Sequence, residues 1–162
     1  MTATLEAPQI HKPGIELYQH MLGTFDFSQI TWTMRRYHAE MTEEHAQGML
    51  HAFLQWVALV PSIPDDKWYV MLQTPVEEAF HSFVLNTKYY QRFCQQYLGF
   101  FFHHEPVRNE SVQQQRDGAE FTVNLLEEVY GDKLLPLLKD WRRQFDAREE
   151  VVACVGKGGH CA

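Results

Sequence analysis

Histidine, glutamate and cysteine, the residue types that most often bind metal ions or transfer protons, gather between positions 74 and 106 of this 162-residue chain. The candidates are Glu77, His81, Cys94, His103 and His104. Glu77 and His81 are four residues apart, so their side chains share one face if the segment is helical. A carboxylate and an imidazole placed in this way can bind one metal ion, or the carboxylate can orient the imidazole.

Cys94 and one of the two adjacent histidines would complete such a site from the segments that follow. His103 and His104 are neighbours in the chain, so we expect at most one of them to reach the same centre. Nitrogen, oxygen and sulfur ligands from separate elements suit Zn²⁺ or Fe²⁺, and a thiolate ligand favours zinc. The sequence therefore predicts a small helical protein with a metal-binding His/Glu/Cys cluster and a divalent metal ion, zinc or iron, as its cofactor.

Each of these residues also has a purely structural interpretation. Glu77 can complete a capping box with Thr74 at the start of a helix. His81 can be a hydrogen-bonded interior side chain, and Cys94 can be a small buried hydrophobe. A further alternative makes His81 a general base that Glu77 orients. No nucleophile elbow or dinucleotide motif accompanies the pair, so the sequence leaves enzymatic activity open.

The C-terminal residues 149–162 contain a second set of candidate ligands. Cys154, His160 and Cys161 offer two thiolates and one imidazole, a soft set for Zn²⁺ or Cu⁺, in a glycine-rich segment. The alternative function is therefore an interaction or leader-type scaffold protein, in which a protein partner recognises this tail or the tail is modified. A flexible terminus without function is the competing interpretation.

Helical periodicity dominates the segments that must position these residues. It predicts a compact all-α, single-domain bundle of about six helices over residues 15–148, with an N-terminal arm (1–14) and a flexible glycine-rich C-terminal tail (149–162). The segment before Gly99 is either one long helix or two helices broken at Asn86. The expected helices are 15–25, 28–40, 42–60, 75–98, 111–130 and 132–148. An extended buried stretch is expected near Trp68 to Met71.

Composition limits the classes of protein to which the chain can belong. Hydrophobic residues make up 45% and charged residues 22%, which excludes wholesale disorder. The 21 acidic and 14 basic side chains give a net charge of −7, so no basic face for nucleic acid is expected. No apolar run reaches the length of a membrane span, and the N-terminus lacks the pattern of a signal peptide. We therefore expect a cytoplasmic protein without a nucleic-acid or membrane partner.

The segments 74–81, 87–94 and 99–106 share an ordered set of landmarks. An acidic residue precedes an aromatic residue and His, and then come Thr-x-x-Tyr, Cys, Gly, and His-His before Glu-Pro. This order is similar to that of the poorly characterised bacterial relatives of the plant glycine-rich domain proteins, and it covers about half of the chain.

The resemblance implies a polar or metal site at Glu77, His81, Cys94 and His104, and it implies no particular reaction. It also implies that the Cys- and Gly-containing end of the chain is a short version of the tail of those relatives. The chain departs from their pattern at three positions: Glu77 replaces the commoner Asp, Phe80 stands where Trp is usual, and Phe83 stands where a second His is often found.

Overall fold

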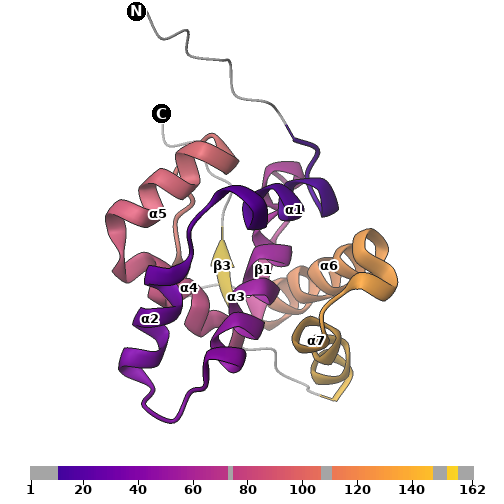
Figure 1. Cartoon of the computed structure of the whole chain (residues 1–162). Coiled ribbons are helices and arrows are strands. Elements are labelled where there is room, and N and C mark those ends of the chain that lie inside the picture. Colours follow the sequence, from indigo (N-terminus) through magenta and orange to yellow (C-terminus); the bar gives the residue numbers. More distant parts are fainter. Residues whose placement is uncertain (1–10, 73–74, 107–110, 148–152, 157–162) are drawn as a thin grey trace, which may run out of the picture.

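The computed structural model describes residues 11–72, 75–106, 111–147 and 153–156. Over these residues the chain is predominantly helical (Figure 1), as predicted, and none of the described helices is long and apolar enough to cross a membrane. The helices are α1 (Ile15–Thr24), α2 (Ser28–Tyr37), α3 (Glu43–Val57), α4 (Pro75–Leu85), α5 (Thr87–Phe93), α6 (Val112–Tyr130) and α7 (Pro136–Ala147). Three short strands accompany them: β1 (Tyr69–Leu72), β2 (Glu105–Pro106) and β3 (Ala153–Gly156).

The ends of the helices follow local signals in the sequence. Thr42 caps α3 by accepting a hydrogen bond from the His45 backbone amide at 3.1 Å, and a capping box with Ser111 begins α6. The predicted break at Asn86 separates α4 from α5. After α5 the chain continues as a π-helical turn, Cys94–Leu98, which ends at Gly99. Gly99 has a φ of 80°, a left-handed conformation that glycine adopts without steric cost.

The start of the last helix was predicted wrongly. We expected it to begin at Asp132, but Asp132 lies in a 3-10 turn, Gly131–Lys133, and α7 begins at Pro136. The side chain of Gln55 holds this connection in place, because it donates to the Lys133 carbonyl at 2.9 Å and accepts from the Leu135 amide at 3.0 Å. Helix α7 thus begins at a proline, a residue favoured at the first helical position, and a long-range contact to α3 holds the turn before it.

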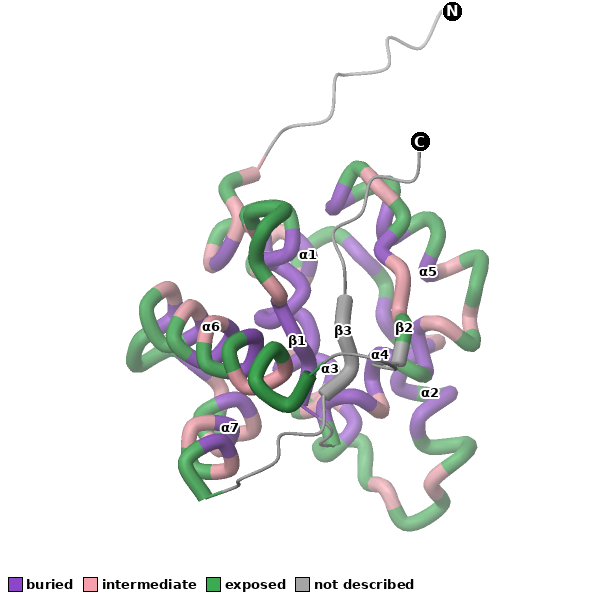
Figure 2. The backbone as a smooth tube through the Cα atoms, turned by 180° about the vertical axis from the view of Figure 1, so that it is seen from behind, coloured by how far each residue is buried: buried purple, intermediate pink, exposed green. Residues whose placement is uncertain are grey.

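Helix α3 is the centre of the molecule and contacts α1, α2, α4 and α7. Figures 1 and 2 show α6 and α7 on one side of it and α2 and α5 on the other, with buried residues concentrated in α3 and β1. Trp56 joins α3 to β1. Its indole N–H donates to the Val70 carbonyl at 3.1 Å, and its own carbonyl accepts from the Tyr69 hydroxyl at 2.8 Å. Strand β1 lies in the expected extended stretch, and all four of its residues are buried.

The strands form a small sheet in the order β1-β3-β2, with β3 antiparallel to both neighbours. Tyr69 pairs with Gly156, and Glu105 pairs with Val155. The backbone of 153–156 was expected in a flexible tail, so that part of the prediction is corrected. Strands β1 and β2 would otherwise leave N–H and C=O groups without partners, and pairing with β3 satisfies them.

Removal of β3 is therefore expected to lower the stability of the protein. A chain ending at Ala147 loses several backbone hydrogen bonds, each worth about 1 kcal/mol net. We expect a Tm lower by roughly 5–10 °C, since 1 kcal/mol shifts the Tm of a chain of this size by about 2–4 °C. The matched control ends at Gly156 and keeps β3. An unchanged Tm for the shorter chain would contradict the pairing.

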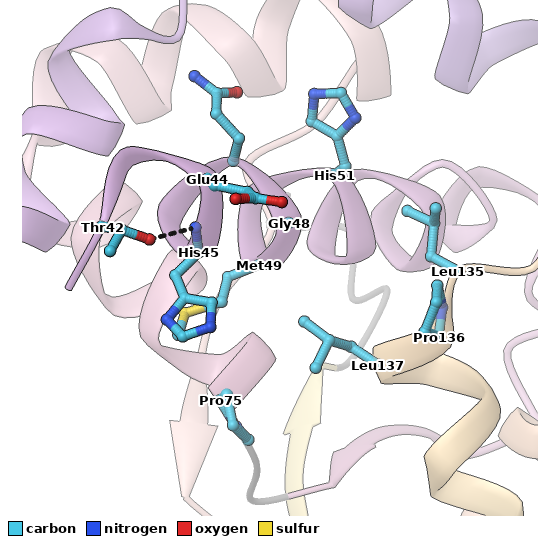
Figure 3. A pocket seen from close by; sticks show the side chains of 11 residues that line it. Thr42, Glu44, His45, Gly48, Met49, His51, Pro75, Leu135, Pro136 and Leu137 are labelled. Atoms are coloured by element: carbon cyan, nitrogen blue, oxygen red, sulfur yellow. Dashed lines mark hydrogen bonds between the residues drawn. The ribbon is translucent and has the colours of Figure 1, made fainter.

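A groove of about 890 Å³ runs along α3 and the start of α7 (Figure 3). Its apolar side is formed by Met49, Leu135 and Leu137, and His45 lies near its polar end. Gly48 faces this groove from the middle of α3, and a Cβ added there would meet no atom within 4 Å. Gly48 is thus a helical glycine that no packing contact requires.

Gly48→Ala is expected to stabilise the fold by about 0.5–1 kcal/mol, because glycine loses more backbone entropy in a helix than alanine does. Gly118→Ala on α6 is the opposite case. Its Cβ would lie 3.0 Å from the Cβ of Trp68 and 3.0 Å from Cγ1 of Val70, both on the segment that packs against this helix. We expect a net loss of stability from this overpacking. Urea unfolding measures the change in unfolding free energy for each variant. Equal changes in the two variants would contradict the close packing around Gly118.

Candidate metal centre

Three of the five predicted ligands converge on one point. Nε2 of His81 lies 3.2 Å from Nε2 of His104 and 3.5 Å from Oε1 of Glu77, and the His104–Glu77 distance between the same atoms is 3.7 Å. These atoms form the one group of three or more potential metal ligands found among the described residues. The centre therefore consists of one carboxylate and two imidazoles.

The triangle of ligand atoms has the size that a transition-metal ion requires. A point equidistant from corners separated by 3.2, 3.5 and 3.7 Å lies about 2.0 Å from each of them. Zinc bonds to histidine nitrogen are about 2.0–2.1 Å and those to carboxylate oxygen about 2.0–2.2 Å. The separations between the three atoms are thus those of ligands bound to one such ion.

Local structure explains how two of the ligands reach this point. Glu77 and His81 lie one turn apart on α4, so the helix alone places them on one face. His104 comes from the extended segment that leads into β2, 23 residues beyond His81. Phe80 of α4 supports it, since the centroids of the Phe80 and His104 rings are 4.3 Å apart.

The centre is buried on one side and open on the other. The side chain of Glu77 is 8% exposed and that of His104 14%, whereas His81 is 47% exposed. Burial lowers the pKa of His104, the neighbouring His81 lowers it further, and Glu77 acts in the opposite direction. His104 is therefore neutral near pH 7, the form in which imidazole binds metal ions.

The other ring nitrogen of His104 has an unusual environment. Nδ1 is buried and has no hydrogen-bond partner among the described residues. Histidines that bind metals commonly donate this second N–H to a carboxylate or a carbonyl, which orients the ring. The ring of His104 packs on Phe80, and its Nε2 lies 3.2 Å from Nε2 of His81.

His103 does not join the centre. Its ring packs against Phe101, with centroids 5.0 Å apart, and it is absent from the ligand group. Of the two adjacent histidines, His104 alone belongs to the ligand group, in agreement with the expectation that at most one would reach the centre. The ring of His104 packs instead against Phe80, so the two adjacent imidazoles have different neighbours.

Cys94 was predicted as a ligand and is not among the converging atoms. It is completely buried on the apolar stripe. Burial raises the pKa of its thiol, and this outweighs the opposing effects of the Phe102 backbone and the Tyr90 hydroxyl. A metal ligand must be a thiolate, so this environment opposes coordination. The alternative interpretation of Cys94 as a small buried hydrophobe agrees with the structure.

Two further predictions lie at or beyond the limits of the described residues. His160 and Cys161 of the tail are outside them, and Cys154 is described only through its backbone in β3, where it pairs with Met71. The capping box expected between Thr74 and Glu77 also involves a residue outside them. The thiol site of the tail and its protein partner stay predictions.

Sequence reasoning missed the residues that surround the ligands. Phe80 forms the wall against which His104 packs, and Tyr90 donates a hydrogen bond to the Phe102 carbonyl. Both positions belong to the landmarks described above, Phe80 directly before His81 and Tyr90 in the Thr-x-x-Tyr element. The order of these landmarks was the available signal that Phe80 and Tyr90 belong to the site. Spacing along the chain does not show which side chains contact one another.

The fold and the centre together define a small helical protein with a partly exposed cluster of one glutamate and two histidines. The chain belongs to the UCP032817-like family, whose model matches residues 18–124. That range contains all three clustered residues and ends within α6. No curated protein and no solved structure matches the chain. The family name carries no activity, and the resemblance to bacterial relatives of the plant glycine-rich domain proteins stays a prediction.

Replacing His104 is expected to make the metal-free protein less sensitive to acid. Because the pKa of His104 is lowered in the folded state, the unfolded chain, with a histidine pKa of about 6.5, binds the proton first. The free energy of unfolding therefore falls as the pH drops below about 6.5, until the folded-state pKa is passed. Burial also lowers the pKa values of His20 and His51. They add the same pH dependence to the wild-type protein and to a variant that lacks His104.

Urea unfolding in the presence of a chelator, at about pH 7.5 and about pH 5, measures this effect. The His104→Gln variant should lose less unfolding free energy than the wild-type protein over this interval. An equal loss in both proteins would show that His104 titrates alike in the folded and unfolded chains.

Proposed function

We propose that this protein binds one divalent metal ion, Zn²⁺ or Fe²⁺, through Oε1 of Glu77 and the Nε2 atoms of His81 and His104. The observation that carries the proposal is the triangle of ligand atoms with edges of 3.2, 3.5 and 3.7 Å. These edges match the separations expected between atoms that bind one ion through bonds of about 2.0–2.2 Å.

The donor set is the one found in two kinds of metal centre. Two histidines and a glutamate bind zinc in hydrolytic enzymes, and two histidines with one carboxylate bind iron(II) in non-haem oxygenases. The sequence-based preference for zinc depended on a thiolate. Since Cys94 is not among the converging atoms, the donors suit both ions.

Three protein ligands leave at least one coordination position free, and the exposed side of His81 gives solvent access to it. A metal ion bound there would act as a Lewis acid toward a water molecule or a small ligand. The residues themselves have separate tasks. Glu77 supplies a buried negative charge, His104 a neutral donor at the protected side, and His81 a donor at the solvent side.

Metal uptake by the purified protein tests the proposal directly. Apo protein is loaded anaerobically with Zn²⁺ or Fe²⁺ and its metal content is measured by elemental analysis. A background carrying Cys154→Ser and Cys161→Ser removes the thiols of the tail as a competing source of binding. We expect one ion per chain.

Substitution of the ligands then assigns the site. His81→Ala, His104→Ala and Glu77→Gln should each weaken binding by at least about 100-fold, because loss of an outer hydrogen-bond partner alone costs 10–100-fold. His103→Ala is the matched control, since it removes the neighbouring imidazole and leaves the centre intact. Absence of stoichiometric metal in the parent protein, or an equal loss in the control, would contradict the proposal.

A further inference from the structure

We infer that Tyr90 is a positioning residue for the metal centre, acting on His104 through the backbone of Phe102. This inference rests on the proposed metal site. It assigns a role to a side chain that is not a ligand, and it explains how His104 is held although its Nδ1 atom lacks a hydrogen-bond partner among the described residues.

The first step is the hydrogen bond between Tyr90 and Phe102. The Tyr90 hydroxyl donates to the Phe102 carbonyl, and both residues are buried. Burial raises the pKa of Tyr90, so its hydroxyl remains protonated and able to donate. Leaving a buried carbonyl without its hydrogen bond costs free energy, so this contact restrains the segment.

The second step is the packing of the Phe102 ring. It stacks on Phe80 with centroids 5.9 Å apart and an interplanar angle of 16°, and it lies 5.8 Å from the ring of Trp56. Phe80 directly precedes His81 on α4. The Phe102 ring thus packs on the same helix, α4, that supplies the other two ligands.

The third step is the geometry of the extended segment. The rings of Phe102 and His104 both pack against Phe80, with centroids 5.9 and 4.3 Å from that of Phe80, so the two side chains share one side of the segment. Phe101 and His103 share the other, where their rings meet. Two residues of extended chain span at most about 7 Å. An anchor at Phe102 therefore limits where the ring of His104 can lie.

Cys94 lies beside the same anchor. Its sulfur is within reach of the Phe102 backbone and the Tyr90 hydroxyl. The cysteine that the sequence offered as a ligand thus contacts the segment that carries a ligand. Its contribution is smaller than that of Tyr90, because a thiol forms weak hydrogen bonds.

Tyr90→Phe tests the inference because it removes the hydroxyl and keeps the ring. The matched control is Tyr97→Phe, which removes a hydroxyl that is hydrogen-bonded to Thr24 Oγ1 at 2.8 Å and not to Phe102. The affinity for Zn²⁺ is measured by competition titration in the Cys154→Ser and Cys161→Ser background, and the visible absorption of bound Co²⁺ reports the ligand geometry. Both are recorded at a temperature at which every variant is folded.

We expect Tyr90→Phe to weaken zinc binding by about 10-fold or more, as loss of an outer partner of a metal ligand does, and to change the Co²⁺ spectrum. Tyr97→Phe should leave both unchanged even if it lowers the Tm to the same extent. If Tyr90→Phe does not fold, Phe102→Leu disturbs the same anchor, and the same changes in affinity and spectrum are expected.

The outcomes separate the two proposals. If the wild-type protein binds zinc and Tyr90→Phe matches Tyr97→Phe in affinity and spectrum, the positioning role is overturned and the metal site stands. If the wild-type protein binds none of Zn²⁺, Co²⁺ and Fe²⁺, the metal site itself is overturned, and the role of Tyr90 with it.

Discussion

The packing of Phe102 against Phe80 is the interaction on which the candidate site depends. It brings an extended segment, 23 residues beyond His81, onto the helix that carries Glu77 and His81. Without it, α4 would present only a carboxylate and an imidazole one turn apart, a pair common on helix surfaces. With it, a second imidazole arrives within 3.7 Å of the carboxylate oxygen, and the pair becomes a group of three.

Charge and burial differ among the three members of the group. Glu77 is almost completely buried, and Oε1 of its carboxylate lies 3.5 Å from Nε2 of His81 and 3.7 Å from Nε2 of His104. The imidazole of His104 stays neutral because burial and the adjacent His81 both lower its pKa. A divalent ion would balance the buried charge and would accept the lone pairs of both Nε2 atoms. Glu77 is thus both a buried residue of α4 and a proposed metal ligand.

The small sheet joins this site to the end of the chain. Strand β2 begins immediately after His104 and pairs with β3, which pairs in turn with β1 beneath α6. His104 thus lies between Phe102, which packs on Phe80, and β2, which pairs with β3. The family match ends within α6, before β3, so the family region holds the clustered ligands and a later segment adds support to them.

The sequence by itself determined most of the helical architecture, because helix periodicity, caps and breaks are local properties. Thr42, Asn86 and Gly99 each act at the position where the pattern placed them. It also determined that Glu77 and His81 would meet, since both lie on one helix. Only the tertiary structure decided that His104 joins them and that Cys94 does not, because contacts between segments depend on how the aromatic core packs, and spacing along the chain does not encode that packing.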